Sequence, residues 1–142
     1  MKKLILFIAF FTSFSSFGQN INRLNDFINE WIGVPYKFGG HTKFGIDCSQ
    51  FNKKLYGYVY GITLPDVCWK QWNFTKRIVK DSLQVGDLVF FNSSRSPSGW
   101  HCGCYIGDGN FVQSPGRGDR VKISSLNDPQ YKRNYKGAGR VL

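Results

Sequence analysis

One cysteine, Cys48, stands where a helix is predicted to begin. Asp47 precedes it and is a good N-cap residue, and Gln50 follows three positions after the cap, the spacing of a capping box. The unpaired N–H groups and the dipole of a helix N-terminus stabilise negative charge, so a thiol on the first turn has a lowered pKa. A buried, inert cysteine is the alternative interpretation. The position makes Cys48 a candidate nucleophile.

A thiolate nucleophile needs a base that takes its proton and later protonates the leaving amine. The chain has two histidines, His41 in a glycine-rich segment and His101 at the start of a predicted strand. A strand would hold its imidazole rigidly, so we expect His101 to be the base. Gln113, on the strand that returns, can accept the imidazole N–H and fix the tautomer. Cysteine, histidine and a polar orienting residue form a papain-type arrangement.

Two or three helices are expected in the first half of the chain. Apolar residues at helical spacing predict a helix over residues 21–32, which a following Gly-x-Pro sequence ends. Residues 36–46 contain three glycines and are expected to be loop. The helix that begins at Asp47 should end at Gly61. Another short helix or an ordered loop is expected over residues 64–76.

Short apolar runs between turn residues predict strands in the second half. They cover residues 88–91, 101–106, 111–113, 120–123 and 137–141. Helices followed by an antiparallel meander make an α+β domain, with the N-terminal helices packed on a small sheet. Alternation along residues 101–106 places His101, Gly103 and Tyr105 on one face and Cys102, Cys104 and Ile106 on the other.

The N-terminal segment has the layout of a secretory signal peptide. Two lysines precede an apolar run from Leu4 to Phe11, and small residues lie before Gln19. The run is too short to span a bilayer, and an uncleaved amphipathic helix is the alternative. We therefore expect a signal peptide over residues 1–18 and one domain over residues 19–142. The product should be exported to the periplasm or outside the cell, with no stable membrane anchor.

The charge of the chain is strongly basic. Nineteen Lys and Arg face nine Asp and Glu, a net charge of +10 at pH 7. Such a protein is attracted to anionic polymers, although scattered charges also simply keep a surface solvated. No motif of a nucleic-acid-binding module is present, so nucleic acid is not an expected partner. We expect a monomer that needs no cofactor.

The remaining cysteines raise two alternatives. His101, Cys102 and Cys104 are close in sequence and could bind zinc, but strand alternation directs both thiols away from the imidazole, so no metal site is expected. An exported chain can also form disulfides. A bridge from Cys68 to Cys102 or Cys104 is left open, because their separation in space is not known from sequence.

Several segments in order resemble the NlpC-type cell-wall cysteine peptidases, a papain-like group, from about Phe27 to Val141. The segments are Gly33-Val34-Pro35-Tyr36-Lys37-Phe38-Gly39-Gly40, Gly45-Ile46-Asp47-Cys48-Ser49, Leu64-Pro65 with Gln71, Leu83-Gln84-Val85-Gly86-Asp87-Leu88-Val89-Phe90-Phe91, and His101-Cys102-Gly103-Cys104-Tyr105-Ile106-Gly107.

The resemblance implies a papain-like fold and a secreted peptidoglycan hydrolase. The bond that such enzymes usually cut follows D-glutamate in the stem peptide, where it is γ-linked to the diamino acid. The resemblance assigns catalytic roles to Cys48 as nucleophile, His101 as base and Gln113 as third polar residue, and substrate contacts to Tyr36 beside the oxyanion and to Asp47 and Ser49 at the N-terminal end of the stem peptide.

The chain also departs from the pattern of this family. Gln50 replaces a usual glycine and Asp66 a usual arginine, both near the expected groove, while Cys102 and Cys104 replace aliphatic residues. Gln113 stands where a second histidine is common. Three alternatives keep the fold: a cell-wall amidase, an antibacterial toxin, and a wall-binding module without catalysis.

Overall fold

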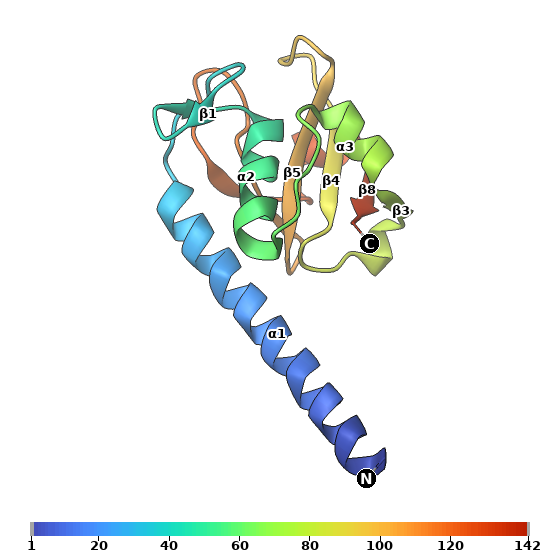
Figure 1. Cartoon of the computed structure of the whole chain (residues 1–142). Coiled ribbons are helices and arrows are strands. Elements are labelled where there is room, and N and C mark those ends of the chain that lie inside the picture. The colour runs from blue at the N-terminus through green and yellow to red at the C-terminus, as the bar shows by residue number, and fades with distance from the viewer. Residues whose placement is uncertain (1, 142) are drawn as a thin grey trace.

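The first helix packs into the domain through its C-terminal end. The computed structural model describes residues 2–141, with side chains from Ser16 onward. Helix α1 (Lys2–Trp31) includes the predicted helix and continues toward the N-terminus, where it extends away from the domain (Figure 1). Its last two turns bury Leu24, Phe27, Ile28 and Trp31. A search of the described residues finds no helix with the length and hydropathy of a membrane span.

Helix α2 (Cys48–Tyr60) begins and ends as predicted. Asp47 is its N-cap, and Gly61 ends it in the left-handed conformation at φ 67°. The predicted loop before it is wrong in part, because β1 (His41–Thr42) and β2 (Gly45–Ile46) form a small hairpin. Two-residue strands are too short to show a hydrophobic period, so the sequence gives no signal for them.

Over residues 2–141, six strands form an antiparallel sheet in the order β3-β8-β4-β5-β6-β7. Strands β4 to β7 make the predicted meander, whereas β8 inserts between β3 and β4. The bounds are β3 (Lys76–Ile78), β4 (Leu88–Asn92), β5 (Trp100–Gly107), β6 (Asn110–Gln113), β7 (Lys122–Ser125) and β8 (Tyr135–Arg140). Helices α3 (Cys68–Phe74) and α4 (Pro129–Asn134) and the 3-10 turn η1 (Lys80–Ser82) complete the chain.

The sheet separates two groups of buried side chains. Helices α2 and α3 lie on one face, in front of β5 and β4 in Figure 1, and Cys102 and Cys104 point into the core on that side. Phe91, Phe111 and Tyr131 pack together on the opposite face. This confirms the predicted alternation along β5 and the α+β class.

One buried ion pair fastens β8 to the turn that precedes β4. The carboxylate of Asp87 is 2% exposed and accepts two hydrogen bonds from Arg140, at 2.8 and 2.9 Å. It also accepts the backbone N–H of Gln84 at 2.8 Å. The pair joins the end of the inserted last strand to the turn before β4, and thus helps to fix β8 beside β4.

Candidate active site

Cys48 is the first residue of α2 and is buried. Asp47 Oδ1 accepts the N–H of Gln50 at 2.8 Å, so the cap is made as expected and the helix dipole acts at the thiol. Hydrogen bonds from the thiols of Cys102 and Cys68 hold the pKa of Cys48 well below its ordinary value, against the effect of burial. A hydrogen bond with His101 and its charge lower the pKa further.

His101 is held by an amide. Its Nε2 lies 2.5 Å from Oε1 of Gln113, and the amide nitrogen of Gln113 donates to Ser124 Oγ at 2.8 Å and to the Tyr131 hydroxyl at 2.7 Å. Because those two hydroxyls engage the NH₂ group, the carbonyl faces the ring, and a carbonyl can only accept. In this arrangement Nε2 carries the proton, and Nδ1 is the ring nitrogen that is free to accept one.

The Cys48 thiol borders a groove of about 300 Å³. Tyr36, Asp47 and Ser49 line the same groove, so the structure brings these expected substrate-binding residues together, whereas His41 is exposed on the hairpin and does not line it. Burial, and then the negative charges of Cys48 and Asp47, raise the pKa of Tyr36 to about 12. Its hydroxyl is thus protonated near neutrality and can donate a hydrogen bond.

The carboxylate of Asp47 is largely engaged by the protein itself. Its Oδ1 accepts from the Ser49 hydroxyl at 3.1 Å, and its Oδ2 accepts the N–H of Gly39 at 3.1 Å. These bonds fasten the glycine-rich loop to the first turn of α2. Burial raises the pKa of this carboxyl, against the hydrogen bonds that lower it.

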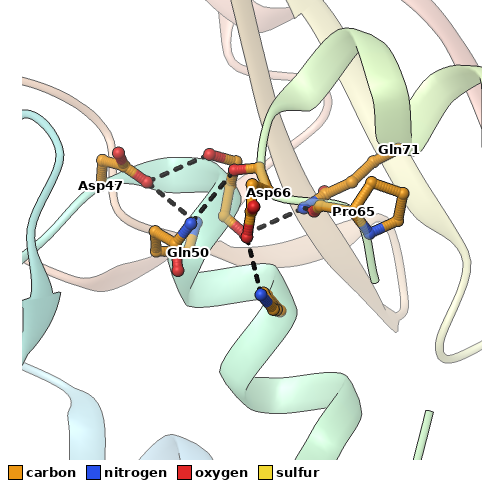
Figure 2. Close-up of polar contacts among 7 residues, drawn as sticks. Asp47, Gln50, Pro65, Asp66 and Gln71 are labelled. Carbon is orange, nitrogen blue, oxygen red and sulfur yellow. Dashed lines mark hydrogen bonds and ion pairs between the residues drawn. The ribbon is translucent and has the colours of Figure 1, made fainter. Parts of the chain in front are cut away.

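Two of the residues that depart from the family pattern, Gln50 and Asp66, touch each other. Gln50 Nε2 donates to the backbone oxygen of Asp66 at 3.2 Å, and Lys53 forms an ion pair with the Asp66 carboxylate at 2.6 Å (Figure 2). The hydrogen bond from Lys53 and its charge lower the pKa of Asp66. Both Gln50 and Asp66 line the groove and together form part of one wall of it.

A buried glutamine positions this wall and the helix beside it. Gln71 Nε2 donates to the backbone oxygens of Ser49 and Pro65, both at 2.9 Å, and the contact with Pro65 is seen in Figure 2. The Asn52 amide donates to Gln71 Oε1 at 3.3 Å. Gln71 thus joins the start of α2 to α3 and sets Cys68 beside Cys48.

Cys68 and Cys102 are the residues near the nucleophile that the sequence did not place there. Cys68 Sγ lies 3.4 Å from Cys48 Sγ, and Cys102 contributes the third sulfur of the group. All four cysteines, which fall within the described residues, are reduced, so neither disulfide left open by the sequence is formed. The three thiols are 20 and 34 positions apart along the chain, counted between their residue numbers, and no local pattern links them.

A thiol at a helix N-terminus, facing a histidine that an amide orients, in a domain of helices on an antiparallel sheet, is the arrangement of a papain-like domain. The chain belongs to the NlpC/P60 family, whose family model matches residues 33–140.

Relatives and solved structures extend the match. The murein DD-endopeptidase MepS/murein LD-carboxypeptidase of Escherichia coli K12 is 39% identical over 85% of this chain and 63% of its own. A probable endopeptidase of Haemophilus influenzae is 35% identical over 85% of this chain and 74% of its own. The gamma-D-glutamyl-L-lysine dipeptidyl-peptidase of Bacillus cereus is 39% identical over 83% of this chain, which spans only 36% of that protein.

The fold is shared with the crystal structure of an NlpC/P60 family protein from Bacillus cereus. The TM-score is 0.76 at 36% sequence identity, over 86% of this chain and 40% of that one. The NlpC/p60 domain of the peptidoglycan hydrolase SagA gives a TM-score of 0.70 at 26% identity, and the match covers 97% of that chain. These comparisons confirm the family and the papain-like α+β fold.

Proposed function

We propose that the chain is a secreted cysteine peptidase that hydrolyses peptidoglycan by cutting its stem peptides. The observation that carries the proposal is the Cys48 thiol on the first turn of α2, with a lowered pKa and with His101 oriented beside it by Gln113. A thiolate and a base in contact are what acyl transfer to sulfur requires. Relatives named as murein endopeptidases supply the substrate class.

The reaction that we propose has four steps. The Cys48 thiolate attacks the amide carbon, and His101 holds the thiol proton as imidazolium. The backbone N–H of Cys48 and the protonated hydroxyl of Tyr36 stabilise the oxyanion. His101 then protonates the departing amine, and an acyl-enzyme remains. Water, deprotonated by the same imidazole, releases the acyl group and restores the thiolate.

The bond that we propose is the one between γ-linked D-glutamate and the diamino acid. The resemblance in the motifs around Cys48 favours it, as does the 39% identity to a protein named as a gamma-D-glutamyl-L-lysine dipeptidyl-peptidase. The relative from Escherichia coli K12 is named for a different, DD bond, at the same identity. The wall formed by Gln50 and Asp66 adds a carboxylate to the groove and is where the choice between these bonds is expected to be made.

We also propose export, with a leader over residues 1–18. The leader falls mostly on residues whose side chains the structure does not describe. Among the side chains that the structure describes, from Ser16 onward, the first buried core residue is Leu24, so cleavage before Gln19 would remove none of those core residues. A monomer without a membrane anchor is consistent with this proposal. Mass spectrometry of the N-terminus of the secreted product tests it directly.

Digestion of defined muropeptides tests the function. The purified chain is incubated with disaccharide tripeptide, tetrapeptide and cross-linked dimers, and the products are weighed. Loss of the diamino acid segment from the tripeptide supports the proposed bond, separation of the dimer supports the DD bond, and release of the intact peptide identifies an amidase. Absence of any product, or full activity in Cys48→Ala or His101→Ala, would refute the peptidase mechanism.

A further inference from the structure

Three thiols from three different elements meet beside the groove. Cys48 begins α2, Cys68 begins α3, and Cys102 lies on β5. The sulfurs of Cys48 and Cys68 are 3.4 Å apart, and all three lie within 4.8 Å of one another. Their residues are 8%, 5% and 0% exposed. We call these three residues the thiol cluster.

The three thiols of the cluster differ in acidity. Hydrogen bonding with Cys102 and then with Cys68 lowers the pKa of Cys48. Burial, and then donation to Cys48, raises the pKa of Cys102. The hydrogen bond with Cys102 lowers the pKa of Cys68, but donation to Cys48, burial and neighbouring charge outweigh it and raise that pKa. The S–H of Cys102 also faces Oε1 of Gln71 at 3.7 Å, and three thiolates this close together need a cation between them.

We propose that the thiol cluster is a binding site for a thiophilic divalent cation, represented by Zn²⁺, and that the bound ion blocks the nucleophile. A tetrahedral zinc ion with Zn–S distances of about 2.3 Å sets its sulfur ligands about 3.8 Å apart. The Cys48–Cys68 sulfur distance of 3.4 Å is shorter than this value, and the 4.8 Å within which all three sulfurs lie is longer. Small side-chain rotations therefore suffice to place the sulfurs around a zinc ion. Cys48 and Cys68 both line the groove, which gives the ion an entry path and water the fourth position.

Charge and proton balance favour the exchange. The metal-free cluster, one thiolate and two thiols, has a net charge of −1. Binding of Zn²⁺ releases one proton from Cys68 and one from Cys102, and three thiolates around a divalent ion again give −1. The buried site thus gains strong bonds without a change of net charge, and no oxidant or reductant takes part. A disulfide would join only two of the sulfurs and would need an oxidant.

The consequence concerns the function proposed above and rests on it. A lone pair of Cys48 that is shared with zinc cannot attack a carbonyl, so the loaded protein is an inactive form that a chelator restores. Cys102 and Cys104 both replace aliphatic residues of the family pattern on β5, and only Cys102 belongs to the cluster. The chain therefore combines a catalytic cysteine with two further donors on neighbouring elements.

The test measures metal binding and activity separately. The full chain is reduced with a phosphine, which leaves no competing thiol, and is titrated with Zn²⁺ against a coloured chelator. Co²⁺ and Cd²⁺ are then used as probes, because thiolate ligands give both ions charge-transfer absorption. Cys102→Ala removes one ligand, and Cys104→Ala is the matched control, on the same strand, on the same face and equally buried.

We expect wild type and Cys104→Ala to bind one equivalent of Zn²⁺, and their Co²⁺ and Cd²⁺ forms to show sulfur charge-transfer bands. Cys102→Ala should bind Zn²⁺ on the order of 100-fold more weakly. Removal of a residue that only supports a metal ligand already weakens metal binding by about 10- to 100-fold. Cys68→Ala should show the same loss of Zn²⁺ affinity. It replaces Cys102→Ala in the test if circular dichroism shows that Cys102→Ala does not fold. Equal affinity in Cys102→Ala and Cys104→Ala, or no charge-transfer band in wild type, would overturn the site.

Inhibition is read in the same samples. Zn²⁺ should abolish both muropeptide cleavage and the labelling of Cys48 by iodoacetamide, and a chelator should restore both. Labelling that continues in the loaded protein would overturn the block of the nucleophile. If zinc binds and protects Cys48 but the metal-free chain cuts no muropeptide, the metal site stands and the proposed function fails. If the chain cuts muropeptides but binds no zinc, the proposed function stands and the metal site fails.

Discussion

Gln113 is the residue whose replacement tests the orientation of the base most directly. It is fully buried, accepts from His101 at 2.5 Å and is itself held by Ser124 and Tyr131. Gln113→Leu keeps the volume of the side chain and removes all three hydrogen bonds. The imidazole N–H and the Tyr131 hydroxyl then lose their partners while they remain buried.

The expected cost has two parts. Leaving a buried polar group without a partner costs about 1–3 kcal/mol, so the free energy of unfolding should fall by about 2–4 kcal/mol. A domain of ordinary stability, about 5–15 kcal/mol, stays folded after such a loss. An imidazole that is no longer held in one tautomer should lower kcat/KM by about 10- to 100-fold, which corresponds to about 1.4–2.7 kcal/mol in the transition state.

The assay measures kcat/KM on a defined muropeptide at a temperature well below the unfolding transition. Thermal unfolding of the same samples is recorded separately. Gln113→His is the control, because a second histidine is common at this place in the family pattern and can also accept from His101. It should retain activity within about tenfold, the effect of one 1.4 kcal/mol change. Wild-type kcat/KM in a folded Gln113→Leu protein would refute the role of this residue in orienting the base.

Three further predictions use other parts of the structure. The rate of alkylation of Cys48 by iodoacetamide depends on the fraction of thiolate, so alkylation should persist below the pH range of an ordinary thiol. Cys102→Ala removes the hydrogen bond that lowers the pKa of Cys48 most, and should move the midpoint of the alkylation-rate profile to higher pH. A midpoint that does not move contradicts this. Asp47→Ala removes the cap of α2 and should cost about 1–2 kcal/mol in denaturant unfolding, whereas Asp47→Asn, which can still cap, should cost less. Asp87→Ala leaves Arg140 without its buried partner and should cost about 2–4 kcal/mol; a loss below 1 kcal/mol, as for an exposed pair, would show that this pair does not fasten β8.

The local features of the site could be predicted because each rests on neighbouring residues. The cap at Asp47, the stop at Gly61 and the alternation along β5 depend on hydrogen bonds or side-chain directions within a few residues. Gln113 was placed beside His101 because a tight turn between the two strands leaves few possible registers. The predicted start of the strand over residues 120–123 is wrong, because β7 begins at Lys122, two residues later.

Features that depend on distant pairing could not be predicted in the same way. Strand β8 enters between β3 and β4, although nothing in its own sequence distinguishes this place from the edge of the meander. The hairpin of β1 and β2 is too short for a periodic signal. The contact of Gln50 with Asp66 needs the loop before α3 to return to α2, and Gln71 makes that return through bonds to Ser49 and Pro65.

The sequence by itself determined that Cys48 stands at a helix N-terminus, that His101 lies on a strand, and that Gln113 can reach the imidazole. Those properties follow from caps, periodicity and a short turn, all of which act locally. Only the tertiary structure decided that Cys68 and Cys102 lie against Cys48, because three elements must pack before their thiols meet. The same packing sets Cys102, which strand alternation directs into the core, and Cys68 beside Cys48, and hydrogen bonding with both lowers the pKa of Cys48.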